Sequence, residues 1–263
     1  HPRQLPVISL TFFPPEKAAD PNRVTTGRQT AVLPLARTAV EIFAELRRAQ
    51  PTITIHGRTQ YVVEGDLCLD EVGLLDYAAE REALQTRAVP EDEPQPQGLV
   101  AVTDDDLRIV RWKKGLVLTY AVLKSTFADE EQYQTVVDAM HKATAEGEAA
   151  AGVNFQHLEH LDGGLEPDDE HPIFVVDGLD TKGKLIAAAF FPNDPPSERR
   201  LILDPSYFAP DLGYDQVGVL RHELGHVLGF RHEHIRSGAP AICPDEPESG
   251  TIDLTDYDPQ SVM

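Results

Sequence analysis

Apolar and polar positions in the second half of the chain follow two patterns, one typical of helices and one typical of strands. Over residues 130–151, Val136, Met140 and Ala143 recur at the spacing that places them on one side of a helix. A second helix is predicted over residues 214–228. Short apolar runs bounded by turn-forming residues predict strands at 116–122, 154–158, 173–176, 185–191 and 201–203. The predicted elements therefore follow an α/β-type order.

The first third of the chain has a weaker pattern that predicts a smaller α+β unit. Apolar side chains recur at helical spacing over residues 38–50, and Thr38 can cap the first turn of that helix. A second helix is predicted over residues 69–86. Strands are predicted at 5–13, 52–55 and 60–63, the last two forming a hairpin around His56 and Gly57.

The two predicted units are separated by residues 89–97, which read VPEDEPQPQ. Three prolines among acidic and glutamine side chains are typical of a stiff, solvated linker. We therefore expect one domain over residues 1–97 and another over residues 98–263.

Composition excludes several classes of protein. The 263 residues carry a formal net charge of −21, which argues against binding to nucleic acid or to anionic membrane surfaces. No apolar run approaches the roughly 20 residues that span a bilayer. Two cysteines, Cys68 and Cys243, exclude a disulfide-dense scaffold and leave one bridge or two free thiols as alternatives.

The strongest chemical signal is the run HELGHVLGFRH, which fits the pattern H-E-x-x-H-x-x-G-x-x-H. His222 and His226 lie four residues apart and share one helix face, so both imidazoles can bind one ion. Gly229 can end the helix in a left-handed conformation, which lets the chain turn back and bring His232 to the same ion. Three imidazole ligands leave a fourth position for water, as in catalytic zinc sites, and Glu223 can hold that water. The alternative is a surface helix with solvated histidines.

These residues resemble the metzincin zinc endopeptidases. The run GFRHEHIR from Gly229 resembles the astacin pattern. The run YDPQSVM from Tyr257 resembles the segment entering the Met-turn, with Met263 beneath the metal. The run KGKLIAAAFFP from Lys182 resembles the matrixin edge strand that pairs with substrate, which assigns that role to Ala187, Ala188 and Ala189.

The resemblance implies a fold, an activity and a cofactor. The fold would be a metzincin-like α+β catalytic domain, with a twisted mixed five-stranded sheet and two long helices. The chain would be a secreted zinc endopeptidase that acts on proteins or peptides, with Zn²⁺ on the three histidines and Glu223 as general base. It would end directly after Met263, without the rest of the C-terminal subdomain. A non-catalytic zinc-binding interaction module is the competing hypothesis.

Upstream of the linker, the run from Val63 to Leu67 resembles the F-x-G-D segment of astacin pro-peptides. This resemblance implies that residues 1–97 form a pro-segment in the chain's own active-site cleft, where Asp66 binds the zinc and keeps the enzyme latent. Cys68 is a second candidate for that ligand, by analogy with matrixin pro-peptides. An ordinary strand-to-helix turn at these residues is the third alternative.

A further cluster of histidines and acids follows the first strand pair. His157, His160, Asp162, Asp168 and Asp169 could suggest a second metal site, but the run lacks the spacing of an EF-hand. We expect a solvated acidic loop there.

Overall fold

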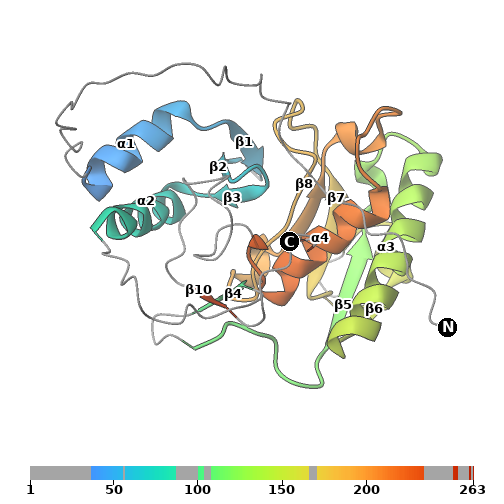
Figure 1. Ribbon diagram of the computed structural model, residues 1–263. Coiled ribbons are helices and arrows are strands. Elements are labelled where there is room, and N and C mark those ends of the chain that lie inside the picture. Colours follow the sequence, from blue (N-terminus) through green and yellow to red (C-terminus); the bar gives the residue numbers. More distant parts are fainter. Residues whose placement is uncertain are drawn as a thin grey trace, which may run out of the picture.

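The computed structural model describes residues 37–55, 57–86, 100–103, 108–165, 171–233, 251–253, 261 and 263. Figure 1 shows their arrangement. The strand expected at 5–13 and the linker expected at 89–97 lie outside the described residues, as do Cys243, Asp168 and Asp169.

The larger unit is built on a mixed five-stranded sheet. In spatial order its strands are β6 (Asn154–His157), β5 (Val117–Val122), β7 (Phe174–Gly178), β9 (Arg200–Leu203) and β8 (Ala187–Ala188). Neighbouring strands run parallel, except that β8 pairs antiparallel with β9 at one edge. The predicted α+β class and mixed five-stranded sheet are confirmed. The run expected as a strand over 185–191 forms only the two-residue β8, which leaves Ala189 outside it.

Two helices pack against this sheet (Figure 1). The helix α3 (Glu130–Ala151) begins after Asp129, which caps it, and ends at Gly152 in a left-handed conformation. The helix α4 (Gln216–Leu228) begins after the capping residue Asp215. Their shared core with the sheet includes Leu118, Tyr120, Val136, Met140, Leu201, Leu220 and Leu224. Short 3₁₀ turns among the described residues connect these elements: η1 (Lys124–Thr126), η2 (Glu159–Leu161), η3 (Pro196–Glu198) and η4 (Pro205–Phe208).

In its described residues, the smaller unit has two helices and three strands. The helix α1 (Ala39–Ala49) is closed by a capping box between Thr38 and Glu41. The predicted hairpin is present as β1 (Thr52–Ile55) and β2 (Arg58–Val63), and a third strand, β3 (Leu67–Leu69), pairs with β2. The helix predicted from residue 69 begins later, as α2 (Glu71–Thr86), because Leu69 belongs to β3 and Asp70 caps the helix through the Gly73 N–H.

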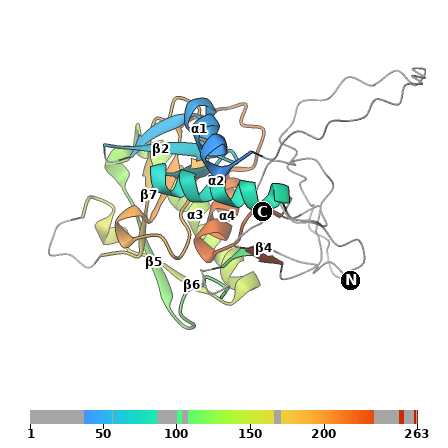
Figure 2. The same ribbon diagram turned by 90° about the vertical axis from the view of Figure 1, so that its left-hand side faces the viewer.

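The smaller unit packs on the β8 edge of the larger sheet. Figure 1 places β1, β2 and β3 between the two N-terminal helices and β8, and in Figure 2 those helices lie in front of the sheet. Ile53 and Val62 form one apolar cluster with Leu185 and Ala188. Polar contacts reinforce this packing: Arg58 pairs with Glu198 at 3.1 Å, and Lys184 donates to the Thr52 carbonyl.

A short ladder joins distant parts of the larger unit. The strand β4 (Val100–Val102) pairs antiparallel with β10 (Thr251–Asp253). The Val102 N–H also donates to the Gly229 carbonyl at 2.9 Å, and Ala101 forms a β-bridge with Phe230. The ladder therefore supports the backbone immediately beyond α4.

The loop expected to be solvated around Asp162 is instead partly buried. Asp162 is 3% exposed, and its carboxylate accepts hydrogen bonds from the Val122 N–H and the Tyr133 hydroxyl. His157 lies 2.9 Å from the same carboxylate. The expectation was wrong for Asp162 and His157 because the end of β5 needs an acceptor for its N–H, and Asp162 supplies it.

Candidate metal centre

The helix α4 and the turn after it position three imidazoles. His222 and His226 lie one turn apart on α4, and their rings are 4.8 Å apart between centroids. Gly229 ends the helix with φ of 98°, and the Phe230 N–H donates back to the Gly225 carbonyl at 3.0 Å. This reversal brings the ring of His232 to 5.2 Å from that of His222.

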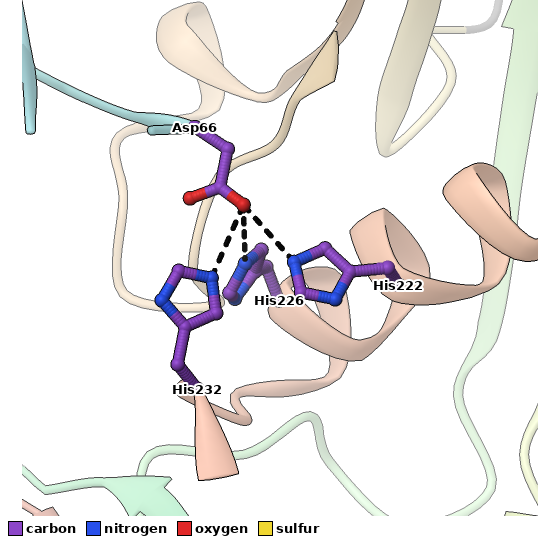
Figure 3. Close-up of side chains that lie close together, drawn as sticks. All are labelled: Asp66, His222, His226 and His232. Atoms are coloured by element: carbon purple, nitrogen blue, oxygen red, sulfur yellow. Dashed lines mark hydrogen bonds and ion pairs between the residues drawn. The ribbon is translucent and has the colours of Figure 1, made fainter. Parts of the chain in front are cut away.

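A carboxylate from the smaller unit completes the group. One oxygen of Asp66 lies 3.0 Å from His222 Nε2, 3.1 Å from His232 Nε2 and 3.8 Å from His226 Nε2. One ligand atom from each residue can be chosen so that all four lie within 4.8 Å of one another. Figure 3 shows the three rings directed at the Asp66 oxygen from below. The structure thus brings together the three predicted histidines and Asp66.

The protonation of His226 shows that this group suits a cation. Its Nδ1 lies 2.8 Å from the Phe230 carbonyl, which can only accept, so Nδ1 carries the proton. Burial lowers the pKa of His226 to about 4, so the ring is neutral and Nε2 presents a lone pair. That lone pair faces the Asp66 oxygen at 3.8 Å in a fully buried position and has no hydrogen-bond partner. A metal ion between two such donors satisfies both.

The charges around the site act in opposite directions on its two carboxyls. Burial would raise the pKa of Asp66, but the charge of His232 and the hydrogen bonds to His222 and His232 hold that pKa well below its usual range. Burial, and then the negative charge of Asp66, raise the pKa of Glu223 well above its usual range. Glu223 is 2% exposed, and its Oε2 has no hydrogen-bond partner. Two carboxyls with pKa values moved apart are typical of a hydrolytic site.

Met263 packs against the helix α4. A Cβ added at Gly225 would overlap the Met263 sulfur, so the thioether packs directly on the backbone between the two helical histidines. This is the place that the Met-turn resemblance assigns to Met263.

Cys68 takes no part in the metal group. Its thiol is free, and burial raises its pKa to about 12, so it holds its proton. The carboxylate of Asp66 occupies the position for which Cys68 was the second candidate.

One pair of residues was not predicted as part of the site. Glu64 Oε1 lies 2.6 Å from an Nη of Arg231, and Glu64 Oε2 lies 3.5 Å from His232 Nδ1. The signal available in the sequence was an acidic residue two positions before Asp66 and a basic residue within the zinc motif. Neither position has a fixed residue type in the motif, so spacing alone gave no reason to join them.

Comparison with protein families supports the chemistry of this centre. The family model described as Matrixin matches residues 111–262, which is more than half of the chain. No curated protein matches the chain. Among the described residues, no helix is long and apolar enough to cross a membrane.

Proposed function

The chain belongs to the matrixin family of metzincin-type zinc metallopeptidases, and from this premise we propose that it is an endopeptidase held latent by its own N-terminal segment. The observation that carries the proposal is the Asp66 carboxylate inserted among the three histidines. We divide the chain at the linker, with residues 1–97 as the pro-segment and residues 98–263 as the catalytic domain.

His222, His226 and His232 are the proposed zinc ligands, with Asp66 as the fourth ligand of the latent form. Zinc in such a site supplies Lewis-acid polarisation of the scissile carbonyl and lowers the pKa of water toward ~7. The hydrogen bond from His226 Nδ1 to the Phe230 carbonyl fixes the ring so that Nε2 is available to the ion.

Glu223 is the proposed general base and acid. It follows His222 directly on α4 and is buried. Burial, and then the charge of Asp66, raise the pKa of its carboxyl, which supports a role in proton transfer. It would take the proton of the attacking water and deliver it to the leaving amine. Once Asp66 leaves, one negative charge that raises the pKa of Glu223 leaves with it, which favours the ionised form that a base requires.

The edge strand β8 is the proposed binding strand for extended substrate. Among the residues that the structure describes, Ala187 and Ala188 pair only with β9, and we propose that a peptide binds the other backbone edge. In this structure Ile53 and Val62 pack with Ala188. The N-terminal segment would therefore obstruct both the metal and the peptide-binding strand.

Proteins and peptides are the substrates that a metallopeptidase implies. We also propose that the protein is secreted, that it binds neither nucleic acid nor membranes, and that its pro-segment is of the astacin type. The net charge of −21 supports the absence of polyanionic partners. The rival hypothesis of a non-catalytic zinc module is less favoured, because the buried Glu223 beside the histidines has no role in such a module.

Replacing Glu223 tests the proposal. We expect Glu223→Gln to bind zinc as the wild type does and to lose peptidase activity by about 10²-fold or more, because the proton acceptor is gone. The full chain would be folded, cut at a protease site placed between Thr86 and Val100, and assayed on casein with zinc content measured in parallel. Glu159→Gln, an exposed carboxyl on η2, is the matched control. Equal turnover by the Glu223 variant and the control would contradict the assignment.

A further inference from the structure

The ion pair between Glu64 and Arg231 is buried beside the metal centre. The side chain of Arg231 is 9% exposed and that of Glu64 is 0% exposed, with 2.6 Å between their charged atoms. Glu64 adopts φ of 55°, a left-handed conformation that costs a residue with a side chain about 1 kcal/mol or more. This strained conformation occurs at the residue whose carboxylate pairs with the Arg231 guanidinium.

Arg231 pairs with a carboxylate of the N-terminal unit. Glu64 precedes Asp66 by two residues, and the charge of Glu80 of α2 also acts on Arg231. Removal of the N-terminal segment takes both carboxylates away together. An arginine in a recess without a counter-charge binds anionic groups strongly, because its planar fork matches a carboxylate.

The carboxylate of Glu64 also lies next to a proposed metal ligand. Glu64 Oε2 lies 3.5 Å from His232 Nδ1, while Nε2 of the same ring lies 3.1 Å from Asp66. A carboxylate on Arg231 is therefore separated from the metal centre by the width of one imidazole. A peptide lying across the three histidines can reach this point with a side chain close to its scissile bond.

We propose that Arg231 is a specificity-determining residue that binds an acidic side chain of the substrate near the scissile bond, and that Glu64 occupies this subsite in the latent chain. The proposal rests on the endopeptidase function proposed above. In the latent chain, Asp66 takes the place of the reacting group and Glu64 takes the place of the recognised side chain. The N-terminal segment thus imitates two features of a substrate at once.

Matched peptides test the specificity. The full chain is folded, cut between Thr86 and Val100, and given fluorogenic peptides with a single Glu, or Gln in its place, at each of the three positions on either side of the scissile bond. We expect kcat/KM to favour Glu over Gln by about tenfold or more at one position, chiefly through KM, as for a hydrogen bond between charged groups. A ratio near one at every position overturns the proposal.

Variants test whether Arg231 causes the preference in kcat/KM for Glu over Gln peptides. We expect Arg231→Gln to abolish the preference for Glu and Arg231→Lys to retain part of it, because lysine keeps the charge but loses the fork. Arg221→Gln is the matched control, since Arg221 of α4 pairs with Glu146 of α3. A preference that survives Arg231→Gln, or that disappears equally in the control, overturns the proposal.

A binding measurement separates this inference from the peptidase activity itself. A labelled peptide with the sequence of residues 60–70 would be titrated onto the cut Glu223→Gln chain after removal of its own N-terminal segment. We expect a Glu64→Gln substitution in the peptide to weaken binding about tenfold or more to the Arg231 form, and to change it little for the Arg231→Gln form. Equal affinities of both peptides for the Arg231 form overturn the inference. If no peptide is cleaved but this difference persists, the endopeptidase proposal fails and the recognition by Arg231 stands.

Discussion

At the scale of single residues, the carboxylate of Asp204 fixes the loop that precedes the β8 edge strand. It is 2% exposed and accepts hydrogen bonds from the Thr181 N–H at 2.7 Å, the Thr181 hydroxyl and the Ser206 N–H. Burial alone would raise its pKa, but these hydrogen bonds hold the pKa of Asp204 below its usual value. The loop that enters β8 is therefore tied to the end of β9 by an ionised side chain.

We expect Asp204→Asn to lower the free energy of unfolding by about 1–3 kcal/mol at neutral pH. The NH₂ group of asparagine would replace one carboxylate oxygen and would face an N–H or O–H donor, so a hydrogen bond would be lost. A lowered native pKa adds stability at pH values above the unfolded pKa of roughly 3.9. That contribution disappears as the pH falls through the native value. Urea unfolding from pH 7 to pH 3 should therefore show the variant and the wild type converging in acid.

The exposed Asp180→Asn change in the same loop is the control for Asp204 and should shift unfolding little, because its ion pair with Lys182 is solvated. A gap between Asp204→Asn and the wild type that stays constant down to pH 3 would contradict the role given to the ionised carboxylate.

The sequence predicted those site residues whose spacing brings their side chains to one ion. His222, His226 and His232 stand at fixed offsets because a helix turn and a glycine reversal impose them. Asp162 was interpreted as solvated, since no local pattern shows that a distant strand end needs its carboxylate. The contact of Glu64 with Arg231 spans 167 positions, and contacts of that range leave no periodic trace in the chain.

At the scale of elements, α4 depends on two glycines for different reasons. A Cβ at Gly229 would lie 2.6 Å from the Val110 carbonyl, a backbone atom that cannot move aside, and the residue has φ of 98°. A Cβ at Gly225 would meet the Met263 side chain, which can rotate away. Gly229 therefore allows the backbone turn, and Gly225 leaves space for the Met263 thioether.

We expect Gly229→Ala to lower the free energy of unfolding by about 2 kcal/mol or more, through strain in the left-handed region and the backbone overlap. Gly225→Ala should cost less stability and act on the site, with weaker zinc affinity as Met263 is displaced. Thermal unfolding and a zinc titration would measure the two effects.

Gly218→Ala in the same helix is the control for both changes. Its Cβ would make only ordinary contacts with Asp215, so the variant should be neutral or more stable by up to about 1 kcal/mol. Equal losses in all three variants would contradict the distinct roles of Gly225 and Gly229.

Elements with marked ends were predicted best. The bounds of α3 agree with the predicted 130–151 because Asp129 and Gly152 terminate its pattern on both sides. The strand β3 was missed, because three residues are too few to show an alternation. The run expected as one strand over 185–191 forms the two-residue β8, which a purely apolar run does not indicate.

At the scale of the whole molecule, both exposed and buried contacts hold the two units together. Arg58 and Glu198 form an exposed ion pair. The buried contacts are the apolar packing of Ile53 and Val62 on the β8 edge, the Glu64–Arg231 ion pair and Asp66 at the metal centre. Exposed pairs contribute little to stability, so we assign the specificity of this arrangement to the buried contacts.

We expect Asp66→Ala in the uncut full chain to raise peptidase activity by about tenfold or more over the uncut wild type, because the substituted chain no longer fills the fourth zinc position. Hydrolysis of a short fluorogenic peptide by freshly purified uncut protein would measure this change. Added chelator should remove the gained activity.

Asp70→Ala is the matched control for Asp66→Ala. Asp70 caps α2 through the Gly73 N–H, so its loss loosens the same segment without touching the histidines. An equal gain in the control would assign the effect to loosening of the segment, and would contradict a specific role for the Asp66 carboxylate.

The ladder between β4 and β10 bears on the maturation proposed above. Because the Val102 N–H donates to the Gly229 carbonyl and Ala101 bridges to Phe230, the stretch from Val100 onward is a structural part of the turn that carries His232. A cut after Val102 would separate β4 from the proposed catalytic domain and would leave this turn without its backbone partners. Under the proposal, we therefore expect the cut to lie ahead of Val100, so that β4 stays with the catalytic domain.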